Sequence, residues 1–86
     1  EVAYKIAPNP LQNQLNLRFS KAILPELDVT IYDLMGNIVF QEKVITGLSD
    51  KSLTINTASL ANGAYTLTIQ DYWKRTSLKF IKAKGN

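Results

Sequence analysis

The sequence predicts an all-β fold, a single immunoglobulin-like antiparallel β-sandwich of about seven strands. First, short segments alternate apolar and polar residues with a period of two, which is the pattern of strands that bury one face. Second, turn residues separate these segments at a spacing close to the roughly eight to twelve residues typical of a sandwich. Third, helical periodicity is weak, and 86 residues hold only one small domain. We therefore expect one domain over residues 1–86.

The first two expected strands lie on either side of a proline motif. A short strand around Tyr4–Ile6 is followed by Pro8-Asn9-Pro10. Because proline cannot donate a hydrogen bond to a sheet, this motif should hold an extended turn and limit further pairing of the strand. Residues 14–19 then alternate, with two leucines and a phenylalanine on one face and polar residues on the other. One face of this strand should lie in the core and the other in solvent.

The next two strands form a predicted hairpin. Residues 27–32 alternate, and residues 38–45 resume the strand pattern after a loop that holds Asp33 and Gly36. Glycine can take the positive φ that this loop needs, and the aspartate carboxylate can accept hydrogen bonds from backbone N–H groups two or three residues on. Both residues thus have a turn role that needs no catalytic one.

The remaining strands follow turn signals of the same kind. In order, we expect a turn at 46–50, a strand at 53–55, one helical turn at 57–60 closed by Asn62-Gly63, a strand at 65–70, a turn at 71–74 and a last strand at 78–80. The asparagine-glycine pair suits a positive φ, so it should end the helical turn before the next strand begins.

The composition excludes most catalytic and metal-binding chemistry. The chain contains neither cysteine nor histidine, which removes disulfides, thiolate nucleophiles, the usual zinc ligands and the side chain that most often transfers protons near neutral pH. Its serines therefore have no histidine to activate them, and no pair of carboxylates stands out by spacing. No apolar run approaches the roughly 20 residues of a membrane-spanning helix. We expect no catalytic residue, no cofactor, no metal site and no transmembrane segment.

The positive charge is concentrated at the C-terminal end of the chain. The net charge is +3. Five basic residues fall in the last thirteen positions, where no acidic residue occurs: Lys74, Arg75, Lys79, Lys82 and Lys84. The first 73 residues carry five bases against seven acids. This asymmetry favours a negatively charged groove on a receptor, because complementary charge speeds encounter and disfavours wrong partners.

Four sequence landmarks occur in a fixed order. They are Pro8-Asn9-Pro10, the segment 29–36 with Ile31-Tyr32-Asp33, Leu60-Ala61-Asn62-Gly63-Ala64-Tyr65, and Lys79-Phe80-Ile81-Lys82. Each is common alone, but their order and spacing resemble the C-terminal sorting domain (Por secretion tail, type A) that Bacteroidetes use for the type IX secretion system. The resemblance runs from about Tyr4 to Lys82.

The resemblance implies an address label. In this family the cargo crosses the inner membrane by its own signal peptide, and the folded domain is then recognised in the periplasm by the outer-membrane secretion machinery. A sortase-like peptidase commonly removes the domain and joins the cargo to anionic lipopolysaccharide at the cell surface, or the cargo is released. On this reading the partners are that machinery, the peptidase and a covalently linked upstream cargo, and the domain performs no catalysis.

The resemblance also implies that the last hairpin carries the recognition signal. The candidate residues are Gly63, Tyr65, Lys79, Phe80, Ile81 and Lys82. Each has a structural alternative. Gly63 could serve backbone geometry, Tyr65 and Phe80 could fill the core, and the lysines could simply be solvated.

Two further functions are consistent with the residues. A surface-binding module for glycans or another protein is the main alternative, because Tyr72 and Trp73 are adjacent at an expected loop tip where aromatic faces can stack on a ligand. Nucleic-acid binding is disfavoured, since phosphate attraction would have to come from one hairpin and no glycine-aromatic motif of an RNA-binding sheet is present.

Overall fold

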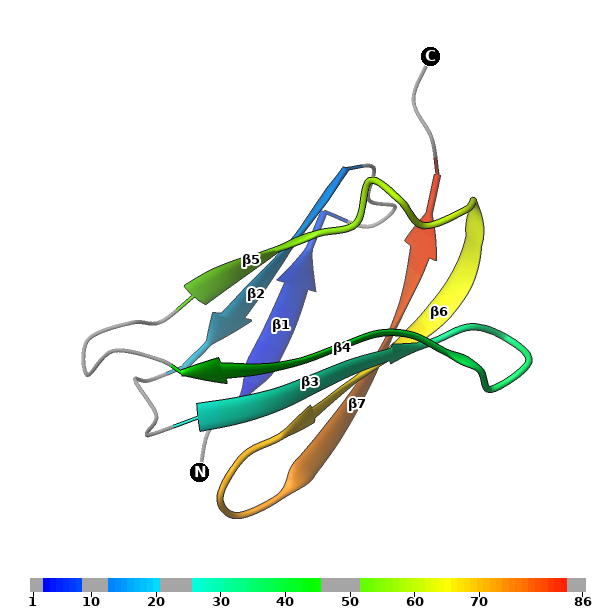
Figure 1. Ribbon diagram of the computed structural model, residues 1–86. Helices are drawn as coiled ribbons and strands as arrows, with labels where there is room; N and C mark the ends of the chain where they lie inside the picture. The colour runs from blue at the N-terminus through cyan, green and yellow to red at the C-terminus, as the bar shows by residue number, and fades with distance from the viewer. Residues whose placement is uncertain (1–2, 9–12, 21–25, 46–51, 84–86) are drawn as a thin grey trace.

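Two antiparallel sheets pack face to face in the computed structural model, which describes residues 3–8, 13–20, 26–45 and 52–83 (Figure 1). The strands found within these residues are β1 (Tyr4–Ala7), β2 (Gln14–Phe19), β3 (Glu26–Tyr32), β4 (Ile38–Ile45), β5 (Ser52–Asn56), β6 (Gly63–Gln70) and β7 (Arg75–Lys82). One sheet has the order β1-β2-β5 and the other β4-β3-β6-β7. This strand order, in which the chain changes sheet after β2, β4 and β5, confirms the predicted immunoglobulin-like sandwich.

The core lies between the two sheets and follows the period-two pattern of the sequence. On β2, Leu15 and Leu17 are fully buried, while the residues between them are partly or fully exposed. The buried apolar side chains are Tyr4, Leu15, Leu17, Phe19, Leu27, Val29, Ile31, Ile55, Tyr65, Leu67, Ile69 and Phe80. Because these residues come from both sheets, the two inner faces must pack against each other to exclude water from the core.

The β3–β4 loop has the predicted chemistry. The Asp33 Oδ1 atom accepts hydrogen bonds from the backbone N–H groups of Met35 and Asn37, each at 2.9 Å. Gly36 has φ of +86°, the left-handed conformation that favours glycine. The Asn37 N–H above all, followed by weaker bonds from the same loop, holds the pKa of the Asp33 carboxyl below its ordinary value, although desolvation acts in the opposite sense. Asp33 therefore has a structural role in this turn.

Residues 57–60 differ from the expected helical turn. A single hydrogen bond closes this segment, from the Leu60 N–H to the Thr57 carbonyl at 3.1 Å. The Thr57 N–H donates to the Asn13 carbonyl at 2.9 Å, so this tight turn is tied to the start of β2. One bond of this kind makes a β-turn, and the chain then enters β6 without a helix. The expected turn at 46–50, and Pro10 of the proline motif, lie outside the described residues.

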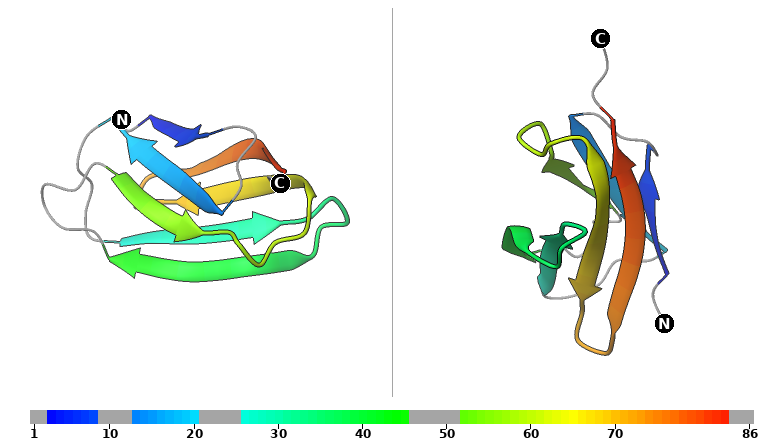
Figure 2. Two further views of the ribbon diagram at one scale, coloured as in Figure 1. Left: turned by 90° about the horizontal axis from the view of Figure 1, so that it is seen from above. Right: turned by 90° about the vertical axis from the view of Figure 1, so that its right-hand side faces the viewer.

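Strands β6 and β7 form the hairpin that contains most of the candidate residues. Their register places Ala64 opposite Ile81, Tyr65 opposite Phe80 and Thr66 opposite Lys79. β7 is the edge strand of its sheet, and β1 of the other sheet lies against it, as the right-hand view of Figure 2 shows. The first and last strands of the domain are therefore neighbours.

Candidate recognition surface on the last hairpin

The candidate residues of β7 divide between the two faces of the strand. Phe80 and Lys82 point into the sandwich, with 1% and 4% of their surface exposed. Lys79 and Ile81 point outward, and Ile81 is 47% exposed. Since neighbouring residues of a strand point to opposite faces, only the second pair is available to a partner of the folded domain. The four-residue landmark thus contains two core positions and two surface positions.

The landmark at residues 60–65 forms the connection into β6. The Tyr65 hydroxyl donates a hydrogen bond to the Ala61 carbonyl at 2.6 Å, which is the tyrosine corner found where a chain crosses between the sheets of such sandwiches. The Tyr65 ring stacks on the Phe80 ring with 5.4 Å between centroids. Gly63 has φ of +154°. The structural alternatives are therefore confirmed for these residues: Gly63 serves backbone geometry, and both rings fill the core.

Lys82 is a buried residue, so the alternative of a solvated lysine is wrong for this position. It is in phase with Phe80 on the inner face of β7, and its aliphatic stem runs along the core. The ammonium donates to the Thr57 carbonyl at 2.7 Å and to the Leu60 carbonyl at 2.8 Å. Two backbone acceptors at the end of the sandwich replace the water that a charged group otherwise requires.

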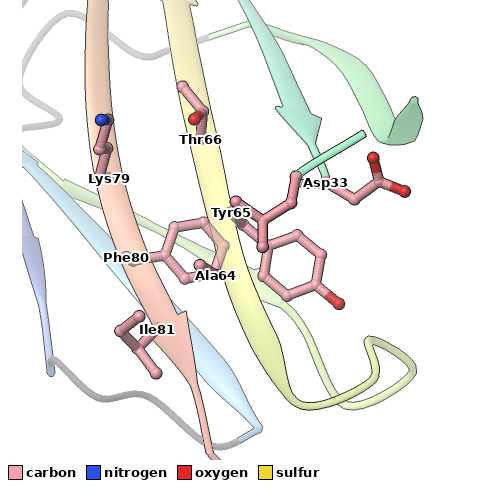
Figure 3. Close-up of a pocket in the computed structure, with 8 residues that line it drawn as sticks. Asp33, Ala64, Tyr65, Thr66, Lys79, Phe80 and Ile81 are labelled. Atoms are coloured by element: carbon pink, nitrogen blue, oxygen red, sulfur yellow. The ribbon is translucent and has the colours of Figure 1, made fainter. Parts of the chain in front are cut away.

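The outward residues line a shallow groove of about 390 Å³. Figure 3 shows Lys79 beside Thr66 on the adjacent strand, with Ile81 farther along β7. The wall opposite β7 comes from the β3–β4 loop, where Leu34 is 81% exposed. The groove therefore carries the Lys79 ammonium on its β7 side and, on the loop side, the Asp33 carboxylate, which already accepts bonds from its own loop. An extended segment that places an acidic side chain at Lys79 and an apolar side chain beside Ile81 and Leu34 matches this chemistry.

The tip of the β6–β7 hairpin presents both predicted aromatic residues. Tyr72 is 79% exposed and Trp73 is 72% exposed. Their rings contact each other edge to face, with 5.2 Å between centroids and 83° between planes. The prediction that this pair lies at a loop tip is confirmed, because Asp71 to Lys74 form the turn.

The Asp71 carboxylate organises this tip. Its Oδ1 atom accepts from the N–H groups of Trp73 and Lys74 at 2.7 and 2.8 Å, and its Oδ2 atom accepts from the Tyr4 hydroxyl at 2.6 Å. Burial acts to raise the pKa of Asp71, but the bonds from Tyr4 and the two backbone donors, with the charge of Lys74, hold that pKa below its ordinary value. Burial first, and then Asp71, raises the pKa of Tyr4 well above its ordinary value. Aspartate is therefore the charged partner and tyrosine the neutral one.

Sequence reasoning missed the two buried polar contacts, one at each end of the sandwich. The burial of Lys82 could have been predicted, because Lys82 continues the alternation of Leu78 and Phe80. The hydrogen bond between Tyr4 and Asp71 could not, since 67 positions separate the two residues. Among the described residues, no buried side-chain nitrogen or oxygen lacks a hydrogen-bond partner. Within the same residues there is no cluster of three potential metal ligands and no helix that could cross a membrane.

Comparison with known proteins supports both the family and the fold. A family described as secretion system C-terminal sorting domain matches residues 5–83. A search of curated proteins gives no match. Among solved structures, a DUF3244 family protein with an immunoglobulin-like β-sandwich fold from Bacteroides vulgatus is 17% identical, with a TM-score of 0.73 over 96% of this chain and 95% of that chain. At this identity the likeness shows the fold alone.

Proposed function

The chain belongs to the family of secretion system C-terminal sorting domains, and from that premise we propose that the outer-membrane machinery reads the outward face of β6 and β7. The family match supports a sorting signal for type IX secretion, with export toward the outer membrane or cell surface. In this proposal the signal domain lies within residues 1–86. The observation that carries it is the division of β7, because a folded domain can show a receptor only Lys79 and Ile81 of the last landmark.

The groove beside these two residues supplies the contact. The Lys79 ammonium attracts an acidic group, and the apolar side chains of Ile81 and Leu34 cover an apolar one. Gly63, Tyr65, Phe80 and Lys82 contribute indirectly, since they fix the strands on which the groove is built. Recognition therefore depends on the fold at four of the six candidate positions and on direct contact at two.

The later steps complete the proposal. The signal domain meets the machinery from the periplasm, and a sortase-like peptidase then separates it from an upstream cargo, which is joined to surface lipopolysaccharide or released. The domain is bound and cut in these steps and catalyses none of them. The sorting family and the sandwich fold favour a non-enzymatic module.

A secretion assay tests the proposal. Residues 1–86 are fused behind a signal peptide and a fluorescent protein in a bacterium that has a type IX system, and reporter is measured in the medium, on the surface and in the periplasm. We expect export of the parent fusion and periplasmic retention of the Lys79→Gln, Ile81→Thr double variant. The matched control is Ser77→Ala, which changes an outward residue of the same strand away from the groove.

Circular dichroism of the isolated domains shows whether each variant folds. Retention of a folded double variant supports direct reading of the groove. Export of that variant at the parent level would show that the machinery reads another surface. Periplasmic retention of the parent fusion itself would refute the sorting function of these residues.

A surface-binding module for glycans or another protein is the second candidate. The exposed pair Tyr72 and Trp73 favours it. Titration with oligosaccharides, followed by Trp73 fluorescence, distinguishes this function from a sorting signal, which should be indifferent to sugars.

A further inference from the structure

The loop between β6 and β7 is held by more hydrogen bonds than a four-residue connection needs. Besides the three bonds accepted by the Asp71 carboxylate, the Asp71 N–H donates to the Lys74 carbonyl at 2.9 Å. The Gln70 side-chain amide donates to the carbonyls of Asp71 and Lys74 at 2.9 and 3.0 Å. These bonds fix the backbone on both sides of the tip. The conformation of the loop is therefore set before any partner arrives, which lowers the entropy cost of binding.

This rigid loop displays two large amphipathic rings. Tyr72 and Trp73 leave most of their surface in water, so burial of these two rings contributes little to the stability of the fold. Their edge-to-face arrangement makes a wedge instead of a flat platform. The Tyr hydroxyl and the Trp N–H give the wedge polar atoms as well as apolar area. Such side chains are enriched where a membrane meets water.

Basic residues border the wedge. Arg75 is exposed at the first position of β7. Lys5 of β1 and Arg18 of β2 lie opposite each other on the exposed face of the other sheet, one position along from Tyr4, whose hydroxyl bonds to Asp71 of the hairpin. Like charges placed opposite on neighbouring strands are unfavourable unless something offsets them. An anionic surface would do so at this corner.

The acidic residues at this corner are engaged by other groups. The Asp71 carboxylate is turned inward and is used by its three donors. Asp28 of β3 lies opposite Gln70 and so in one row with Arg75, and both Asp28 and Glu26 pair with Lys43, at 3.8 and 3.6 Å. The described surface around the tip therefore carries aromatic and cationic groups together.

We propose that this corner binds the surface of a lipid bilayer that contains anionic headgroups. Tyr72 and Trp73 enter the headgroup region, and Arg75 on one sheet and Lys5 and Arg18 on the other contact the phosphates. A glycan fits less well, because sugar hydroxyls need polar side-chain partners around a stacking face. At this tip the Asp71 carboxylate and the Gln70 amide are already engaged within the loop. The proposal does not depend on the sorting function.

The chain carries its own probe for the experiment, because Trp73 is its one tryptophan. The 86-residue domain is titrated with vesicles of phosphatidylcholine alone and with vesicles that also contain phosphatidylglycerol. We expect the Trp73 emission to shift to the blue and to become protected from acrylamide with the anionic vesicles, and much less with the neutral ones. Raised salt should weaken binding, since screening reduces the attraction of the basic residues.

Three variants assign the effect to residues. Tyr72→Ser should weaken vesicle binding about tenfold, because one immersed ring is lost. Arg75→Gln should weaken it about fivefold, the effect of one basic residue near an anionic surface. The matched control is Met35→Ser, which removes an equally exposed apolar side chain from the β3–β4 loop at the opposite end of the same sheet and should leave binding unchanged. All three positions are exposed, so each variant should keep the fold of the parent, and circular dichroism checks this.

Several results would overturn the proposal. One is an unshifted Trp73 emission with anionic vesicles at millimolar lipid. Another is an emission shift produced by oligosaccharides but not by vesicles, which would assign the wedge to sugars. A third is a Trp73→Ser variant that sediments with anionic vesicles as well as the parent does. Equal weakening by Tyr72→Ser and Met35→Ser would also contradict it, because contact would then not be specific to the tip.

Discussion

Replacement of Lys82 by methionine tests whether a buried charge at the end of β7 holds the sandwich together. Methionine keeps the length of the stem and removes the ammonium. The change deletes two charge-assisted hydrogen bonds, at 2.7 and 2.8 Å, and leaves the carbonyls of Thr57 and Leu60 without that donor. Bonds of this class contribute about 1.5–3 kcal/mol each. The ammonium no longer has to be desolvated in the variant, which offsets part of the loss.

The expected net destabilisation is about 3 kcal/mol, out of a total of roughly 4–13 kcal/mol for a domain of this length. With a urea dependence of about 1–1.5 kcal/mol per M, the unfolding midpoint should fall by roughly 2–3 M. Urea unfolding followed by circular dichroism measures this shift.

Lys79→Met is the matched control for this experiment. It makes the same chemical change three positions earlier, on the exposed face of the same strand, and should cost less than about 0.5 kcal/mol. Equal midpoints for the two variants would refute the argument, because the buried ammonium would then contribute no more than a solvated one. In the secretion assay, Lys82→Met should fail through loss of the fold, whereas changes at Lys79 should act without unfolding the domain.

Three further predictions concern other positions. Tyr65→Phe removes the hydroxyl that bonds to Ala61 and should cost about 1–2 kcal/mol in urea unfolding; an unchanged midpoint would mean that the tyrosine corner is not a stabilising contact. Gly36→Ala should cost about 1 kcal/mol, because φ is +86° while an added Cβ meets no atom within 4 Å, so backbone conformation alone is tested. Stability should fall as pH drops below about 4, because the lowered pKa of Asp71 contributes stability only while the carboxylate is ionised. The raised pKa of Tyr4 predicts a further loss in strong alkali, above about pH 10, and Tyr4→Phe should remove that alkaline loss.

The period-two pattern predicted the fold because the apolar residues within each strand already show which face of that strand is buried. The β3–β4 loop was predictable for a similar reason, since Asp33 bonds to N–H groups only two and four residues away. The division of the last landmark was also implicit in the alternation through Phe80. We nevertheless expected Lys82 to be either a contact or a solvated charge, because charged residues are rarely buried unless they are paired.

The partners of Lys82 explain why composition could not reveal its role. Its acceptors are backbone carbonyls 22 and 25 positions earlier, and because every residue has a carbonyl, the residue type does not reveal the acceptor. The Tyr4–Asp71 bond was equally unpredictable, since neither side chain indicates which distant residue it will contact. The tip aromatics were recognised as exposed from the turn that holds them, but the rigidity of that turn depends on the same distant tyrosine. Long-range hydrogen bonds such as these therefore could not be predicted from the sequence.

The contacts at the two ends of the sandwich make its assembly dependent on the final segment of the chain. Tyr4 finds its partner only at Asp71, and the turn at 57–60 gains its ammonium only when Lys82 has been synthesised. Contacts between such distant positions form late, because the intervening chain must first be closed into loops. A chain that stops before Asp71 therefore has neither contact, and one that stops between Asp71 and Lys82 lacks the second. A partner that accepts only the folded form would thus also select domains that were synthesised through Lys82.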